Sequence, residues 1–280
     1  MATPTFIVHP TDLSAVSEGA FHHALKLALA ARCRLGLVHV HGYDAQETPD
    51  LETFPKVRET LERWGLLPDG APQAEVAEKL GVSVSKGEVL AMDPEHGLAR
   101  MLQSENAALI VLGTRGLTGL HRLFEHSFSE HLARAAKIPA LFIPAGVEGF
   151  VNGEDGSVRL KNILLPVTDD PDPTAAIVMA RLVRGLLKQE TQLHVLHVGS
   201  LDSMPVIPAV QDTHEILRKG PVEETIVEVA EEIDADLIVM ATAGHKGFLD
   251  ALRGSSTEEV LRKWRRPLLA VPAGDEDDAA

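Results

Sequence analysis

The sequence has almost no cysteine and few aromatic residues. Cys33 is the only cysteine among 280 residues, so an intramolecular disulfide framework is excluded. It ends the helical run LALAARC, and we interpret it as a buried, inert thiol. Aromatic residues make up 4% of the chain, while alanine, leucine and valine dominate, as is typical of compact α/β domains.

Positive charge and long apolar runs are also scarce. The chain has 26 basic and 41 acidic residues, a formal charge of −15, which argues against bulk attraction to nucleic acid or to an anionic membrane. No stretch approaches 18 uninterrupted apolar residues, so we expect no membrane span. The N-terminal residues have neither the positively charged start nor the long apolar core of a signal peptide. We therefore expect that no signal peptide is present and that the protein is cytoplasmic.

The chain does contain an internal repeat. Four short apolar runs in the first half recur in the same order in the second half: 6–14 and 163–171, 35–42 and 193–200, 107–116 and 235–244, and 138–146 and 266–274. The spacing supports the match, because Gly116 precedes Pro144 by 28 residues and Gly244 precedes Pro272 by the same number. The one large mismatch is a polar insertion in the first half, about residues 43–73.

Each copy alternates apolar runs with helical patterns, which indicates βαβ units around a parallel sheet. The apolar runs are nearly continuous, as expected for strands that are covered on both faces. We therefore predict two α/β domains in tandem, 1–148 and 160–274. The segment 146–161, rich in glycine and polar residues, is the predicted linker.

A glycine-rich loop follows an apolar strand and precedes a helix in both copies, at 113–132 and 241–260. The free N–H groups and dipole of a helix N-terminus attract phosphate, and glycine lets the backbone approach it closely. Ser127 and Ser255 each begin an S-x-x-E pattern. A capping box explains these two serines equally well.

A Thr-Asp pair ends the first apolar run of each copy, Thr11-Asp12 and Thr168-Asp169. Ligands of open parallel sheets bind at the carboxyl ends of the strands, where an aspartate can accept hydrogen bonds from a sugar or a base. The alternative is that each aspartate only caps the helix that follows.

With these motifs the chain resembles a tandem universal stress protein, and the resemblance covers nearly all of its length. The family's phosphate motif is G-x2-G-x9-G followed by Ser or Thr. The resemblance implies open, five-stranded, Rossmann-like parallel sheets of the adenine-nucleotide-hydrolase type, ATP as ligand (with or without Mg²⁺), and pairing of domains through the last strand. We infer a pseudo-dimer within one chain and leave open a homodimer of two chains.

The resemblance assigns nucleotide contacts in both copies. In the first copy His126 replaces the third glycine, whereas in the second copy Ala241 replaces the first. Because His126 places a side chain where a phosphate would lie and Ala241 adds only a methyl group, we predict that the second copy is the better site. The assigned residues are Pro10, Thr11, Asp12, Val40, Gly113, Arg115, Gly116, His126 and Ser127 in the first copy, and Val167, Thr168, Asp169, Val198, Ala241, Gly244, Gly254, Ser255 and Ser256 in the second.

Three functions remain open at this stage. The first is a stress-response or signalling module that binds adenine nucleotide without catalysis, and it is the one we predict. A weak ATPase is the second, although no G-x-x-x-x-G-K-[ST] motif is present. The third is a degenerate scaffold that acts through protein contacts with an empty site or a different ligand. We predict no catalytic residue and no metal site, because the histidines lack a helical i, i+4 pair with a carboxylate partner.

Two smaller segments complete the sequence-based predictions. The stretch ETLERWGLL in the insertion predicts an amphipathic helix that covers the first site or meets a partner. The basic cluster RKWRR, residues 262–266, is interpreted as a solvated helix end that interacts with its own helix dipole.

Overall fold

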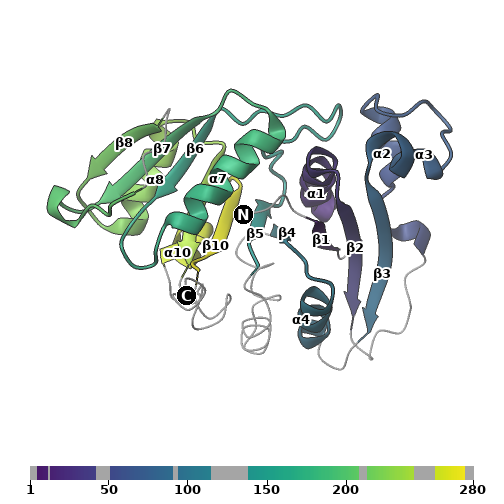
Figure 1. Cartoon of the computed structure of the whole chain (residues 1–280), viewed down its shortest axis with the longest axis horizontal. Helices are drawn as coiled ribbons and strands as arrows, with labels where there is room; N and C mark the ends of the chain where they lie inside the picture. Colours follow the sequence, from purple (N-terminus) through teal and green to yellow (C-terminus); the bar gives the residue numbers. More distant parts are fainter. Residues whose placement is uncertain are drawn as a thin grey trace.

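The computed structural model describes residues 5–11, 13–41, 51–90, 94–114, 138–207, 213–242 and 256–274. Ten strands in these segments form one sheet in the order β3-β2-β1-β4-β5-β10-β9-β6-β7-β8 (Figure 1). The strands of the first half are β1 Phe6–Thr11, β2 Arg34–His41, β3 Ser83–Leu90, β4 Leu109–Thr114 and β5 Ala140–Pro144. Those of the second half are β6 Asn162–Pro166, β7 Gln192–Val198, β8 Thr213–Arg218, β9 Leu237–Thr242 and β10 Leu268–Pro272.

All neighbouring strands within each half run parallel, which confirms the predicted pair of open, five-stranded parallel sheets. The two halves meet where β5 and β10 pair antiparallel, with Phe142 opposite Leu268 and Ala140 opposite Ala270. The last strand of each half therefore joins the halves into one continuous sheet.

Helices cover both faces of this sheet. The helices of the first half are α1 Glu18–Ala31, α2 Val57–Arg63, α3 Ala74–Leu80 and α4 Pro94–Ser104, and those of the second are α7 Thr174–Leu187, α8 Val222–Glu232 and α10 Ser256–Lys263. Short 3-10 turns lie at η1 Ala15–Ser17, η2 Leu51–Thr53 and η3 Leu201–Ser203. Helices α1 and α7 pack against each other across the two halves on one face, and α8 packs against α10 on the other.

The two cores follow from the alternation of side chains along each strand. In β4, Val111 belongs to the cluster beneath α1 and α7, whereas Ile110 and Leu112 belong to the cluster beneath α4, α8 and α10. Both clusters contain residues of both halves. The nearly continuous apolar runs of the sequence are thus explained by burial on two faces.

The segment 146–161 connects β5 to β6 and is packed rather than loose. Val151 and Val158 form an antiparallel bridge, and the side chains of Phe150, Val151 and Leu160 are each 1% exposed. On the side of the first half, the Nε2 atom of buried His23 accepts hydrogen bonds from the backbone N–H of Phe150 (3.1 Å) and of Val151 (3.3 Å). Its Nδ1 donates to the Gly19 carbonyl at 2.7 Å.

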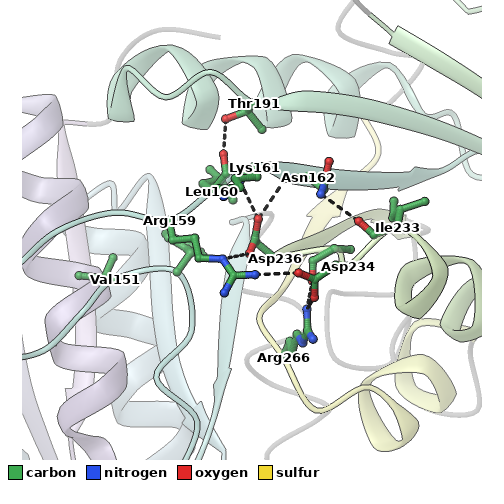
Figure 2. Close-up of polar contacts among 12 residues, drawn as sticks. Val151, Arg159, Leu160, Lys161, Asn162, Thr191, Ile233, Asp234, Asp236 and Arg266 are labelled. Carbon is green, nitrogen blue, oxygen red and sulfur yellow. Dashed lines mark hydrogen bonds and ion pairs between the residues drawn. The ribbon is translucent and has the colours of Figure 1, made fainter.

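The other end of this segment is held by two aspartates of the second half (Figure 2). Asp236 Oδ2 accepts from the backbone N–H of Lys161 (2.6 Å) and of Asn162 (3.0 Å). Asp234 pairs with Arg159 at 2.7 Å and with Arg266 at 2.6 Å. The linker is therefore fixed to both halves by buried polar contacts and by surface ion pairs.

His23 makes the stability of the fold depend on pH. Burial lowers the pKa of His23 to about 4, from an ordinary value of 6.5. Between pH 6.5 and pH 4, His23 is protonated in the unfolded chain but stays neutral in the folded chain. The contribution of His23 to the free energy of unfolding is therefore complete above pH 6.5 and is lost as the pH falls toward 4. We expect the loss to reach about 3 kcal/mol, at 1.36 kcal/mol for each pKa unit.

Urea unfolding of the intact chain at several pH values between 7 and 4 measures this loss. The control is His23→Gln, which keeps an amide acceptor and an amide donor but does not titrate. Its free energy of unfolding should fall less steeply with acidification than that of the wild type. Equal slopes for the two proteins would contradict the assignment.

The described part of the insertion lies away from the carboxyl ends of the strands. Leu61 and Trp64 of the α2 region are buried, and Trp64 Nε1 donates to Gly153 O of the linker at 3.0 Å. Ala77 of α3 and Gly81 directly after it line a cavity with Thr5, Arg34 and Ser83, which lie at the beginnings of the first three strands. The predicted helix is present, but α2 and α3 do not cover the first predicted site.

The cluster RKWRR is only partly the solvated helix end that we expected. Lys263 ends α10 and pairs with Glu224 of α8. Trp264 is buried, and its Nε1 donates to Pro267 O at 3.2 Å. The cluster therefore packs the end of α10 onto the fold, because its central tryptophan is a core residue.

Candidate functional site

The strand order places a switch point in each half. From β1 the chain continues to β2 on one side, whereas β4 lies on the other side of β1, and β6, β7 and β9 repeat this arrangement. The connections that leave the two central strands, β1 and β4 or β6 and β9, therefore diverge at the carboxyl edge. A crevice at this point is the usual ligand position in open parallel sheets.

The end of β1 is held by local hydrogen bonds. Thr11 is buried, and its Oγ1 accepts from the Leu13 backbone N–H at 3.0 Å and lies 3.0 Å from Ser17 Oγ. Leu13 has a φ of 61°, so the backbone turns sharply directly after the strand. Asp12, which the sequence assigned to the ligand, lies outside the described residues. The Thr11 hydroxyl thus supports the turn.

The strand register corrects the equivalence of the two Thr-Asp pairs. His39 Nδ1 donates to Thr11 O at 2.9 Å, and the corresponding His197 Nδ1 donates to Val167 O at 3.0 Å. Thr11 therefore matches Val167 rather than Thr168. Asp169 lies one residue further along an exposed turn. Helix α1 begins seven residues after Thr11 and α7 begins seven residues after Val167, so the two connections are equally long and the Thr-Asp pair lies one position later in the second copy.

The glycine-rich loops start at equivalent places. Gly113 lies opposite Ile143 near the end of β4, and Ala241 lies opposite Val271 near the end of β9. This equivalence agrees with the sequence repeat. The remaining loop residues assigned to phosphate lie outside the described residues: Arg115, Gly116, His126, Ser127, Gly244, Gly254 and Ser255. The ranking of the two copies therefore remains a prediction.

Ser256 has a different contact from the one expected. It is the first residue of α10, and its Oγ donates to Glu223 Oε1 of α8 at 2.6 Å. A hydroxyl that gives its only proton to a carboxylate has none left for a phosphate oxygen. In this geometry the Ser256 hydroxyl links α10 to α8.

The positions assigned to the base and the sugar line the same edge. Val198 ends β7 and is half-buried, and Pro10 is half-buried next to the end of β1. Val40 lies in β2, and nothing is described of its side chain. Beyond exposed Thr168, Asp172 Oδ1 accepts from the Thr174 backbone N–H at 2.7 Å, and hydrogen bonds from Thr174 lower the pKa of Asp172.

Sequence reasoning missed the roles of two histidines. His39 and His197 each donate a hydrogen bond to the carbonyl at the end of the neighbouring central strand, whereas the sequence analysis weighed the histidines only as metal ligands. The His-Val pair that recurs in both copies was the available signal. Within the segments that the structure describes, no group of three His, Cys, Asp or Glu side chains is arranged to hold a metal ion.

Cys33 is buried as expected. Burial raises the pKa of its thiol to about 11, which keeps it protonated at neutral pH. No helix among the described residues is both long and apolar enough to span a membrane.

Comparison with known proteins agrees with this fold. The model of the universal stress protein family matches residues 6–144 and 205–272, well over half of the chain. The chain belongs to the universal stress protein family. Residues 145–204 lie outside the match, and this interval contains β6 and β7 together with the shifted Thr168.

Curated relatives are also universal stress proteins. The universal stress protein E homolog of Haemophilus influenzae is 38% identical over 69 residues, which cover 25% of this chain and 22% of that protein. The chain thus matches about a fifth of the length of this relative. A universal stress protein of Methanocaldococcus jannaschii is 27% identical over 153 residues, 49% of this chain and 80% of that protein.

Two solved structures share the whole fold of this stress protein. A universal stress protein from Archaeoglobus fulgidus covers 98% of both chains with a TM-score of 0.62 and 19% identity. A functionally unknown protein from Pseudomonas aeruginosa covers 96% of this chain and 93% of its own, with a TM-score of 0.62 and 17% identity. Both therefore extend the likeness in fold across the two halves.

Proposed function

We propose that this universal stress protein binds an adenine nucleotide at the carboxyl edge of its sheet and acts as a stress-response or signalling module. The switch point carries the proposal, because in each half the strand that enters the glycine-rich loop lies directly beside the first strand. A loop that binds phosphate and a strand end that faces sugar and base are thereby brought together.

ATP is the proposed ligand, with or without Mg²⁺. The phosphates would lie on the loop glycines and the helix N-terminus, and the adenine beside Val198 in the second half. Phosphoryl transfer needs a concentrated positive charge and a positioned nucleophile, and the sequence has no Walker-type lysine motif. Binding without a dedicated reaction is therefore the proposed activity, with the second half as the stronger site.

The antiparallel pairing of β5 with β10 supports the further proposal that the two halves form a pseudo-dimer. In this arrangement the last strands of the two halves are paired edge to edge, and β3 and β8 are the two edge strands of the sheet. Each half keeps its own switch point, so the two sites are formed by different residues. Their affinities can therefore be measured separately by substitution.

Titration calorimetry with ATP on the intact chain tests the proposal. We expect one dominant site, which Gly254→Val weakens ten- to a hundredfold, because losing a charge-assisted phosphate contact costs about 1.5–3 kcal/mol. Gly274→Val is the matched control, because a Cβ at Gly274 meets nothing within 4 Å. His126→Gly is expected to strengthen a second site.

Two other results would each contradict a different part of the proposal. Tight binding that survives Gly254→Val and is lost with Gly116→Val would make the first copy the working site. If no heat is released with ATP, and no nucleotide is found by mass spectrometry after denaturing the purified protein, the function is that of a scaffold.

A further inference from the structure

Beside the end of β7, the imidazole of His197 is held in one tautomer. His197 is buried, and its Nδ1 lies 3.0 Å from the Val167 carbonyl oxygen. A carbonyl oxygen can only accept a hydrogen bond, so Nδ1 carries the proton of the neutral ring. The lone pair of Nε2 is therefore available to accept a proton, which is the state that a general base requires.

Ser203 places its hydroxyl against this lone pair. The distance from Ser203 Oγ to His197 Nε2 is 2.9 Å, within the range of a nucleophile and its base. The Ser200 backbone N–H donates to the same Oγ at 3.1 Å, and the Ser200 carbonyl oxygen, 3.0 Å away, is a second acceptor for the Ser203 proton. Rotation of the hydroxyl directs that proton to Ser200 O or to His197 Nε2. The approach depends on Gly199, because a Cβ there would lie 2.6 Å from His197 Nε2 and 2.8 Å from Ser203 Oγ.

The surroundings of Ser203 are open to solvent and partly apolar. Ser203 itself is exposed, while its base is covered. In the same segment, Leu201 is 72% exposed and Val206 is 99% exposed. The exposed Leu201 and Val206 side chains offer an apolar chain a surface to contact beside the hydroxyl.

We propose that Ser203 is a nucleophile that accepts an acyl group from an activated acyl donor, an ester or thioester with an apolar chain. His197 Nε2 takes the hydroxyl proton while Ser203 Oγ forms a bond to the acyl carbon. The bond from that carbon to the leaving oxygen or sulfur then breaks, and the leaving group takes the proton from His197. The products are an acyl ester of Ser203 and a free alcohol or thiol.

An acyl group fits this site better than a phosphoryl group. Phosphoryl transfer needs cations around the reacting phosphate, and the charged residue next to Ser203 is the exposed Asp202. The exposed Leu201 and Val206 instead suit an acyl chain. Of the residues assigned to the nucleotide, the proposed reaction uses only the backbone carbonyl of Val167, so the labelling of Ser203 can be tested without ATP.

Acetylation of the intact chain by p-nitrophenyl acetate tests the proposal. We expect a single ester, removed by hydroxylamine and mapped by peptide mass spectrometry to Ser203. It should form about a hundredfold faster than at the exposed Ser104, since a positioned base contributes at least that factor.

Three variants separate catalysis by the base from simple exposure. His197→Gln should reduce labelling of Ser203 to the rate of Ser104, and Gly199→Ala should also reduce it by separating the two groups. Ser104→Ala is the control and should leave the labelling of Ser203 unchanged. The mapping on the wild-type chain remains decisive even if a variant fails to fold. Equal rates at Ser203 and Ser104, labelling unchanged by His197→Gln, or an acetyl group only on His197 would overturn the proposal.

Discussion

Gly156→Ala is expected to lower the free energy of unfolding by about 3–5 kcal/mol, although it adds only one methyl group. Gly156 has a φ of 68°, and a Cβ there would lie 2.4 Å from Cδ2 of the buried Trp64 indole. The ring cannot stay where it is, so its packing against the linker and its hydrogen bond to Gly153 O are lost. Displacing a buried tryptophan has a cost similar to removing it.

The matched control is Gly146→Ala. Gly146 has nearly the same backbone conformation, with a φ of 73°, but nothing lies within 4 Å of its Cβ position. Its substitution should therefore cost only the backbone strain, about 1–2 kcal/mol. Chemical denaturation of both variants measures the difference. If the two variants are equally stable, Trp64 does not hold the linker as the structure indicates.

His23→Leu is expected to lower the free energy of unfolding by about 2–6 kcal/mol, because it leaves two buried N–H groups without an acceptor at about 1–3 kcal/mol each. These are the backbone N–H groups of Phe150 and Val151, whose side chains are 1% exposed. Leucine fills a similar volume but offers no lone pair, so the change isolates the hydrogen bonds from the packing.

His22→Leu controls for the loss of a histidine at the neighbouring position of α1. His22 is half-buried, and its Nε2 contacts the exposed Arg63 guanidinium at 3.3 Å. Removing this contact should change the free energy of unfolding by less than about 1 kcal/mol. Urea denaturation at pH 7 compares the two variants. A small effect of His23→Leu would mean that the linker N–H groups find water or another acceptor.

Both expectations concern the connection between the halves, which the sequence described least well. The composition of 146–161, rich in glycine and polar residues, suggested a plain linker. In the structure His23 reaches it across 127 residues of sequence and Trp64 across 89. Contacts between residues so far apart leave no periodic pattern in the sequence.

The sequence by itself determined the repeat, the α/β class and the start of the glycine-rich loops. These features are local: apolar runs of strand length, helical spacing and a constant offset of 128 residues between Leu109 and Leu237. Strands that are buried on both faces of a parallel sheet need nearly continuous apolar residues, so these strands can be recognised from the sequence alone. The equivalence of Gly113 and Ala241 followed from the same offset.

Only the tertiary structure decided which groups meet at the carboxyl edge. The hydrogen bonds of His39 and His197 show that Val167, not Thr168, matches Thr11, because register is fixed by cross-strand bonding rather than by sequence similarity. The contact of Ser256 with Glu223 and that of Ser203 with His197 likewise depend on where separate elements pack. Side-chain directions across a packed interface are set by the neighbours that fill the space, and a single sequence does not specify those neighbours.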